Sequence, residues 1–177
     1  MPASYFGIVR SGYENVRYTK EGSTVDYDPP VDTSSPQYRR EITGGTGVNQ
    51  ANIFWRGELT IAASGVVVLD LNGAANADIF GINLAMLTLC DLMVINAPVL
   101  STTAANTTNV TLTTTIAGVL AGGTPNLPIK PGGKVHYSNF EAGGISVITP
   151  TTADTITLTN AAGATARVQL AVIGRSI

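Results

Sequence analysis

Apolar and polar positions alternate in short stretches over the last third of the chain, residues 127–177. Residues 155–159 alternate strictly, and residues 166–173 alternate again after a turn sequence at 160–163. A period of two places every second side chain on one face of an extended strand, so both stretches predict β-strands. Pro131-Gly132-Gly133 predicts a turn at which two extended segments meet. We expect a meander of short antiparallel strands in this region.

The strand pattern begins earlier, at Ile53. Residues 84–95 are almost continuously apolar, a pattern shared by buried strands and helices, and the flanking strands together with β-branched Val94 and Ile95 favour a strand. Residues 74–81 are long enough for one helical turn. Further strands are predicted at 53–62, 66–71, 110–116, 127–129, 134–137 and 145–148. Eight or nine short strands without βαβ spacing predict an all-β fold, an antiparallel sandwich of jelly-roll type.

Residues 1–50 form a different kind of polypeptide. They contain five of the six tyrosines, a Pro-Pro pair and a Gly-rich stretch at 44–47, with no sustained period of 2.0 or 3.6. Such a segment buries little apolar surface by itself, so we expect it to gain order by lying against a partner. We interpret 1–50 as an extended N-terminal arm and 51–177 as the β-sandwich domain. A disordered tail and an N-terminal strand of the domain are the alternatives.

The composition is poor in charge and rich in threonine. Charged residues make up 12% of the chain, against about 25% in a typical soluble domain, and 23 residues are Thr. A surface with so few charges favours an assembly or an interaction partner. A robust secreted domain with a Thr-rich face is the alternative, although the N-terminal residues lack the charged and apolar regions of a secretory signal.

Charge and cysteine content narrow the function classes. A formal net charge of −2, with no basic run beyond Arg39-Arg40, argues against a nucleic-acid partner. The apolar run 82–100 is interrupted by Asn83, Asp91 and Asn96, so we expect no membrane partner. The single cysteine, Cys90, lies in that apolar run and is expected to be a buried small side chain.

No catalytic constellation is apparent. The sequence contains one histidine, His136, and no Gly-x-Ser-x-Gly nucleophile elbow for which it could act as a base. One His with one Cys cannot build a zinc site. The acidic cluster at 26–32 fails the EF-hand template, because its sixth position is Val31 and its twelfth is Gln37. Most of the remaining acids lie at expected strand ends or turns. We therefore predict no enzyme activity, no catalytic residue, no cofactor and no metal site.

Several motifs resemble small virion proteins of tailed bacteriophages that are encoded near the capsid genes. They are residues 54–63, 69–71, 77–81, 129–133 and 151–160, together with the ending Ala171-Val172-Ile173-Gly174-Arg175-Ser176. The resemblance covers roughly residues 53–177. It implies a capsid cement or decoration protein, a jelly-roll domain that sits on the outer capsid surface as a trimer or dimer. It also implies synthesis in the host cytoplasm and no catalysis.

The resulting hypothesis is a virion structural protein that binds the major capsid protein and stabilises the shell. The domain would self-associate through Thr, Val and Ala faces as a homo-oligomer, while arm residues anchor to neighbouring subunits. The expected partner-binding residues are Tyr5, Phe6, Tyr13, Tyr18, Tyr27, Tyr38, Arg39 and Arg40. The alternative is a receptor- or glycan-binding module of a tail or baseplate. Its aromatic platform would come from Phe80, Tyr137 and Phe140.

Overall fold

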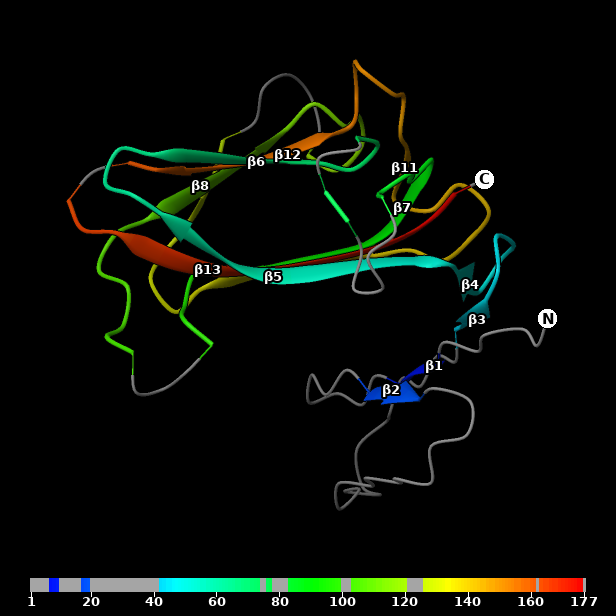
Figure 1. Ribbon diagram of the computed structural model, residues 1–177, viewed down its shortest axis with the longest axis horizontal. Coiled ribbons are helices and arrows are strands. Elements are labelled where there is room, and N and C mark those ends of the chain that lie inside the picture. Colours follow the sequence, from blue (N-terminus) through cyan, green and yellow to red (C-terminus); the bar gives the residue numbers. More distant parts are fainter. Residues whose placement is uncertain are drawn as a thin grey trace.

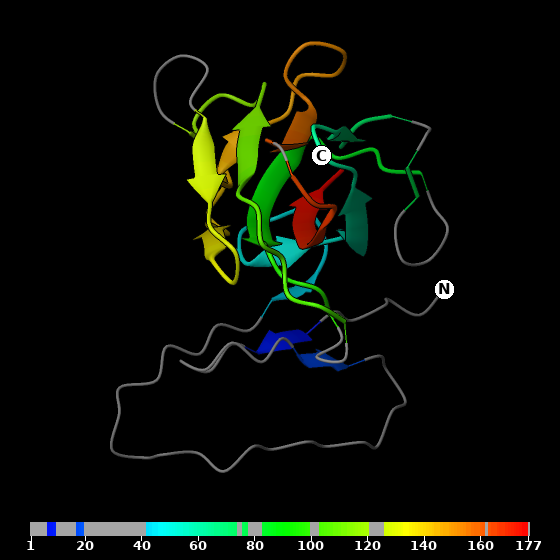
Figure 2. The ribbon, with the colours of Figure 1, turned by 90° about the vertical axis from the view of Figure 1, so that its left-hand side faces the viewer.

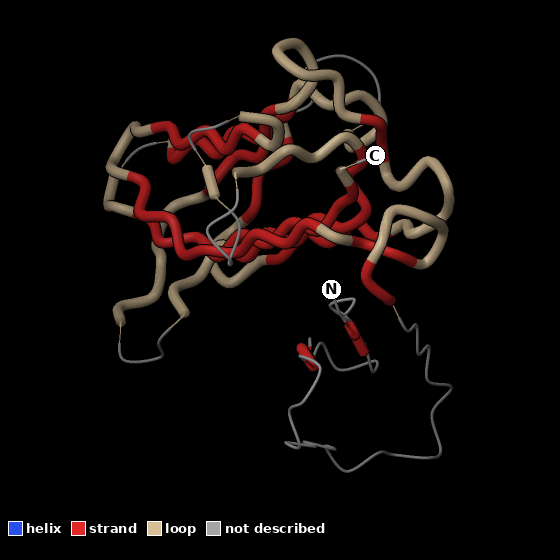
Figure 3. Tube along the Cα trace, turned by 45° about the vertical axis from the view of Figure 1, so that its right-hand side comes forward, coloured by secondary structure: helices blue, strands red, loops and turns tan. Residues whose placement is uncertain are grey.

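The computed structural model describes residues 7–9, 17–19, 42–73, 76–77, 83–99, 103–120, 126–161 and 163–176. Within these ranges every regular element is a β-strand, as Figure 3 shows. The strands are β1 (Gly7–Val9), β2 (Arg17–Thr19), β3 (Thr43–Gly44), β4 (Gln50–Ala51), β5 (Ile53–Ile61), β6 (Val66–Asp70), β7 (Thr88–Ile95), β8 (Val110–Thr114), β9 (Leu127–Ile129), β10 (Lys134–Ser138), β11 (Ser146–Val147), β12 (Thr155–Asn160) and β13 (Ala166–Arg175).

Two antiparallel sheets pack face to face. The five-stranded sheet has the order β10-β7-β13-β5, with β11 also pairing with β7, and the four-stranded sheet has the order β6-β12-β8-β9. Figure 1 shows β6, β12 and β8 as one layer above β5 and β13, and Figure 2 views the same layers turned by 90°. The all-β prediction and the antiparallel sandwich are confirmed. The short pairs β1–β2 and β3–β4 lie outside these two sheets.

The expected meander at 127–177 is wrong. The strands form where the alternation predicts them, but β9 pairs with β8, β10 with β7, β12 with β6 and β8, and β13 with β5 and β7. Apart from β10 and β11, which both pair with β7, consecutive strands of this region therefore change sheets instead of forming hairpins. A connection of a few residues spans the roughly 10 Å between packed sheets as readily as it closes a hairpin. Alternation reports which face of a strand is buried, and it does not report which strand lies beside it.

The main core fills the space between the sheets. On β12 the buried side chains are Ile156 and Leu158, and on β13 they are Val168, Leu170 and Val172. Each removes apolar surface from water, worth about 1.5–3 kcal/mol for a fully buried aliphatic side chain. The Thr residues of β12 point to the other face, so the strict alternation seen in the sequence becomes an inner apolar row and an outer polar row.

A second, smaller cluster covers the outer face of the five-stranded sheet at one end. It consists of Ile42, Ala51, Phe54, Cys90, Phe140 and Ile173. Because β7 is covered on both faces here, its residues 88–92 are all buried, the polar Thr88 and Asp91 included. Ile42 is 2% exposed, so the chain already packs against the sheet before the arm boundary placed at residue 50.

A β-bulge in β7 sets the direction of its side chains. Ile173 pairs with Asp91, but the next residue, Gly174, pairs with Leu89, so Cys90 is the extra residue. A bulge places two consecutive side chains on one face. Cys90 and Asp91 both reach the outer face, where Cys90 joins the small cluster and Asp91 lines a groove.

Candidate functional site

The outer face of the five-stranded sheet carries a groove of about 380 Å³. Its floor comes from β5, β7 and β13, whose outward side chains include Met93 and Ala171. Phe54 and Ile173 of the small cluster close one end, and Val99 forms part of a wall. Arg56, Glu58, Asp91 and Gln169 supply polar groups. The groove is therefore an apolar trough with a charged rim.

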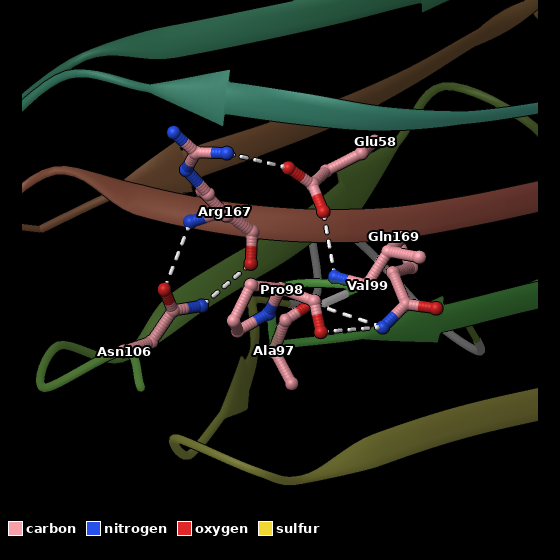
Figure 4. A network of polar contacts seen from close by, with 7 residues as sticks. All are labelled: Glu58, Ala97, Pro98, Val99, Asn106, Arg167 and Gln169. Atoms are coloured by element: carbon pink, nitrogen blue, oxygen red, sulfur yellow. Dashed lines mark hydrogen bonds and ion pairs between the residues drawn. The ribbon is translucent and has the colours of Figure 1, made fainter. Parts of the chain in front are cut away.

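The wall is a loop that is tied onto the sheet by polar contacts (Figure 4). The backbone N–H of Val99 donates to Glu58 Oε2 at 2.6 Å. The Gln169 side-chain amide donates to the carbonyls of Ala97 and Pro98 at 3.2 and 3.1 Å. These bonds satisfy loop backbone groups that would otherwise need water, and they fix Val99 beside the groove.

A buried asparagine holds the other end of this loop. Asn106 Nδ2 donates to the Arg167 carbonyl at 2.6 Å, and the Arg167 N–H donates back to Asn106 Oδ1 at 2.9 Å. Asn106 Nδ2 also donates to Oδ1 of Asn96, whose own amide donates to the carbonyls of Thr108 and Ile129. The loop is thus anchored to β13 and to the neighbourhood of β9 through two buried amides.

Glu58 is an acidic residue of the groove rim that is bonded to both Val99 and Arg167. The Val99 N–H bond, then the hydrogen bond and charge of Arg167, hold the pKa of Glu58 below its ordinary value. Its Oε1 lies 3.0 Å from Arg167 Nη1. The carboxylate is therefore ionised at neutral pH and oriented from two sides.

His136 lies beside one of the acids of the groove. Its Nε2 lies 3.2 Å from Oδ2 of Asp91, which is almost fully buried. The two groups sit on neighbouring strands β10 and β7. Both acids of the groove are therefore engaged, Asp91 with His136 and Glu58 with Arg167.

Cys90 is fully buried, which confirms the prediction made for it. No local sequence pattern predicts the residue that it contacts. Arg175 is also buried, and its Nε donates to Cys90 Sγ at 3.1 Å, while its terminal nitrogens donate to the carbonyls of Glu141 and Ala142. This arginine holds the 141–142 loop against the end of the sheet.

Two further acids of the described ranges, Asp70 and Asp154, serve turns. Asp70 Oδ1 accepts from the N–H of Asn72 at 2.9 Å, and Asp154 Oδ2 accepts from the N–H of Thr151. Such side-chain bonds stabilise tight turns. Within the part of the chain that the structure describes, no group of three His, Cys, Asp or Glu side chains is placed to hold a metal ion.

The outer face of the four-stranded sheet is different in character. Register places Val68 beside Thr157 and Thr113, and Val66 beside Thr159 and Thr111. We call these six residues the Thr/Val face. None is charged, and Val66 and Val68 are 56% and 53% exposed. The face presents methyl and hydroxyl groups on short, stiff side chains.

The predicted partner-binding residues are mostly beyond the described ranges. Tyr18 lies in β2, which pairs antiparallel with β1. Tyr5, Phe6, Tyr13, Tyr27, Tyr38, Arg39 and Arg40 lie outside the described residues. Their role in binding therefore stays a prediction.

The glycan platform expected from Phe80, Tyr137 and Phe140 is not assembled. Phe140 is 1% exposed because it packs in the small cluster with Phe54 and Ile173, so its assignment to a surface platform is wrong. Phe80 lies outside the described residues. Among the Phe, Tyr and Trp side chains whose burial the structure describes, all from residue 42 onward, Tyr137 is the exposed one, at 36%.

In the described ranges no helix has the length and apolarity needed to cross a membrane. Comparisons with protein-family models, with curated proteins and with solved structures find no match for this chain.

Proposed function

We propose that this protein is a virion structural protein of the capsid cement or decoration type, which binds the outer surface of a capsid shell and stabilises it. The observation that carries the proposal is the Thr/Val face, an uncharged sheet surface with two half-exposed valines. Short β-branched side chains lose little rotamer entropy when they are buried, so such a face suits contact with a second protein. The low charge of the whole chain agrees with a protein that works in an assembly.

The finer fold assignment, a jelly roll, belongs to the same proposal. We count as eight the strands β5, β6, β7, β8, β9, β10, β12 and β13. In one sheet the first strand, β5, then lies beside the eighth, β13, and the third, β7, lies beside the sixth, β10. In the other sheet the second strand, β6, lies beside the seventh, β12, and the fourth, β8, lies beside the fifth, β9. That is the order of one long hairpin rolled into two sheets, the arrangement of jelly-roll domains of viral capsids. The strand order therefore supports the jelly roll.

The arm is the second attachment in this proposal. Its tyrosines would supply contact area at low entropic cost, and Arg39 and Arg40 would pair with acids of neighbouring capsid subunits. Fifty extended residues reach on the order of 150 Å, enough to cross to an adjacent subunit. When the Thr/Val face and the arm both bind the shell, the fraction of shell sites occupied exceeds that for either attachment alone, because the second contact forms at high effective concentration. The expected lattice partner is the major capsid protein.

The test is co-sedimentation of the purified protein with undecorated shells. Because Ile42 packs in the domain, deletion of residues 2–41 removes the arm and keeps the small cluster. We expect saturable binding of the full chain in fixed ratio to capsid subunits, and loss of binding on deletion. Absence of saturable binding would refute the proposal, and unchanged occupancy after deletion would refute the role of the arm.

A pair of matched variants tests the Thr/Val face. Val68→Lys puts a charge on that face, and Val147→Lys puts the same charge on β11 of the other sheet, where Val147 is 63% exposed. We expect Val68→Lys to weaken shell binding about tenfold or more, since a buried unpaired charge is costly. Val147→Lys should bind like the unmodified protein. Equal binding by both variants would exclude this face as the contact.

The alternative, a glycan-binding tail module, has weaker support because Phe140 is buried and Tyr137 is the one exposed residue among the Phe, Tyr and Trp side chains whose burial is described. It predicts saccharide binding that is lost on Tyr137→Ala and is independent of the arm.

A further inference from the structure

Strand β6 forms one edge of the four-stranded sheet. It pairs with β12 along its whole length and has no second strand partner among the described residues. In an antiparallel pair every second residue of each strand turns its N–H and C=O away from the partner. At the end of β6 the carbonyl of Asp70 accepts from the side-chain amide of Asn76 at 3.2 Å. The edge that is left for a further strand is therefore that of residues 66–69.

This edge lacks the features that usually discourage strand addition. Proteins blunt exposed edge strands with short length, Pro or Lys. The opposite edge of the same sheet, β9, is three residues long and contains Pro128. Strand β6 has five residues, no Pro and no base, and its single charge is Asp70 at the last position. An edge of this kind is a template for a further strand.

The side-chain rows of the Thr/Val face end at β6. Register aligns Val66 and Val68 each with one Thr of β12 and one Thr of β8. A strand added beside β6 places one more side chain in each row, next to these two valines, which are more than half exposed. Pairs of β-branched and aromatic side chains stabilise neighbouring strands in such positions. The face therefore continues without a break onto a strand that pairs with β6.

The inner side of β6 is apolar as well. Val67 alternates with the two exposed valines, so it points between the sheets, where it is half-buried and packs against the main core. A strand beside β6 covers the exposed part of Val67 with its own inward side chain. A charge on that strand loses water and finds no charged partner on residues 66–69. The edge therefore suits an extended segment that is uncharged and carries apolar or Thr side chains.

We propose that β6 accepts an extended, uncharged segment of the capsid shell protein as an added strand of the four-stranded sheet. This inference rests on the proposed function and names how the Thr/Val face attaches. Main-chain hydrogen bonds along β6 supply affinity, and the side chains beside the valines supply specificity. The occupant is a shell segment because it extends the surface that is already assigned to the shell.

Strand addition differs from a flat contact in the part of β6 that it covers. A shell surface laid on the Thr/Val face contacts the outer valines alone. An added strand also contacts Val67 on the inner side and binds the backbone N–H groups that point away from β12. Exchange of these N–H groups and the effect of a charge at Val67 therefore separate the two modes.

The first experiment measures hydrogen exchange by mass spectrometry on the full chain, free and bound to undecorated shells. In the free chain the β6 amides that point away from β12 should exchange quickly, because edge groups are exposed to water. In the bound chain we expect their exchange to slow about tenfold or more, because they become hydrogen-bonded. Amides of β9, at the opposite edge of the sheet, should change little.

The second experiment compares shell binding by two matched variants. Val67→Lys puts a charge on the inner side of β6, and Leu127→Lys puts the same charge on β9, where Leu127 is likewise half-buried against the main core. We expect Val67→Lys to bind shells about tenfold or more weakly, and Leu127→Lys to bind like the unmodified chain. Far-UV circular dichroism reports whether each variant is folded. If Val67→Lys does not fold, exchange in the unmodified chain decides.

The possible results separate this inference from the cement proposal. Shell binding that leaves β6 exchange unchanged, or that is as strong in Val67→Lys as in Leu127→Lys, would overturn strand addition and leave the cement proposal standing. Absence of saturable shell binding would refute the cement proposal, and this inference with it. Slow exchange of all β6 amides in the free chain would also overturn strand addition, because a second copy or the chain itself then covers the edge.

Discussion

The Nε of Arg175 donates a hydrogen bond to the Sγ of Cys90 across 3.1 Å, and both side chains are almost completely buried. The guanidinium also satisfies two carbonyls of the 141–142 loop. A buried cation is normally expensive, and here hydrogen bonds on three sides offset that cost. Arg175 is therefore a structural residue that closes the end of the sandwich where β13 leaves the sheet.

Replacing Arg175 by Met is expected to reduce the free energy of unfolding by about 2–4 kcal/mol, because buried carbonyls lose their donors and a cavity remains. Urea unfolding followed by circular dichroism measures the loss. The matched control is Arg167→Met, on the same strand, whose ion pair with Glu58 is exposed and is expected to contribute little to stability. Equal losses from the two variants would contradict the structural role assigned to Arg175.

Asn106→Ala is expected to detach the loop that forms the wall of the groove. The variant loses the paired bonds with the backbone of Arg167 and the bond to Asn96, at a cost of about 1–3 kcal/mol. Hydrogen exchange of the Arg167 amide should accelerate, because that N–H donates to the Asn106 side chain. Asn109→Ala, at an exposed position of the same loop, should leave both measurements unchanged. Unaltered exchange at Arg167 in Asn106→Ala would count against this anchor.

The lowered pKa of Glu58 predicts a pH dependence with a defined sign. A carboxyl group whose pKa is lower in the folded than in the unfolded chain stabilises the fold above the unfolded value, and the stabilisation disappears as the pH falls through the folded pKa. Glu58→Gln should therefore be less stable than the unmodified protein at pH 7, and the difference should close at acid pH below 4.5. Urea midpoints at several pH values test this. If the stability difference between Glu58→Gln and the unmodified protein stayed the same at acid pH, the charge of Glu58 would not be its cause.

Gly174→Ala is expected to destabilise the protein by about 1–3 kcal/mol, because a methyl group there meets the Met86 sulfur and the Thr88 carbonyl beside the bulge. Gly143→Ala is the matched control, since nothing lies within 4 Å of a Cβ at that position. Its effect should stay within about 0.5 kcal/mol. Thermal unfolding of the two variants side by side makes the comparison. Similar losses would mean that the bulge tolerates a side chain.

Strand positions were largely predictable because a half-buried strand must alternate. The pattern placed strands at 53–62, 155–159 and 166–173, and the structure has β5 at Ile53–Ile61, β12 at Thr155–Asn160 and β13 at Ala166–Arg175. Continuous apolarity also identified β7, although the reason for it, coverage of both faces, came from residues near Ile42 and Phe140.

Polar residues inside the fold were much harder to interpret. The sequence predicts Asn160 only as the start of a turn, yet its buried amide donates to the carbonyls of Ile61, Ala62 and Ala164 and so joins the ends of two strands from different sheets. In the sequence Asn96 is only an interruption of an apolar run. A polar residue in such a run signals that a buried hydrogen-bond partner exists, but the partner is distant in sequence and leaves no local pattern.

By itself the sequence determined the all-β class, the positions of most strands and the burial of Cys90, since these follow from alternation and apolarity along a few neighbouring residues. Only the tertiary structure decided which strands are neighbours, where residues 97–99 and Asn106 are anchored, and that Arg175 lies beside Cys90. Those features join residues tens of positions apart, and their free energy depends on two sheets meeting in one register.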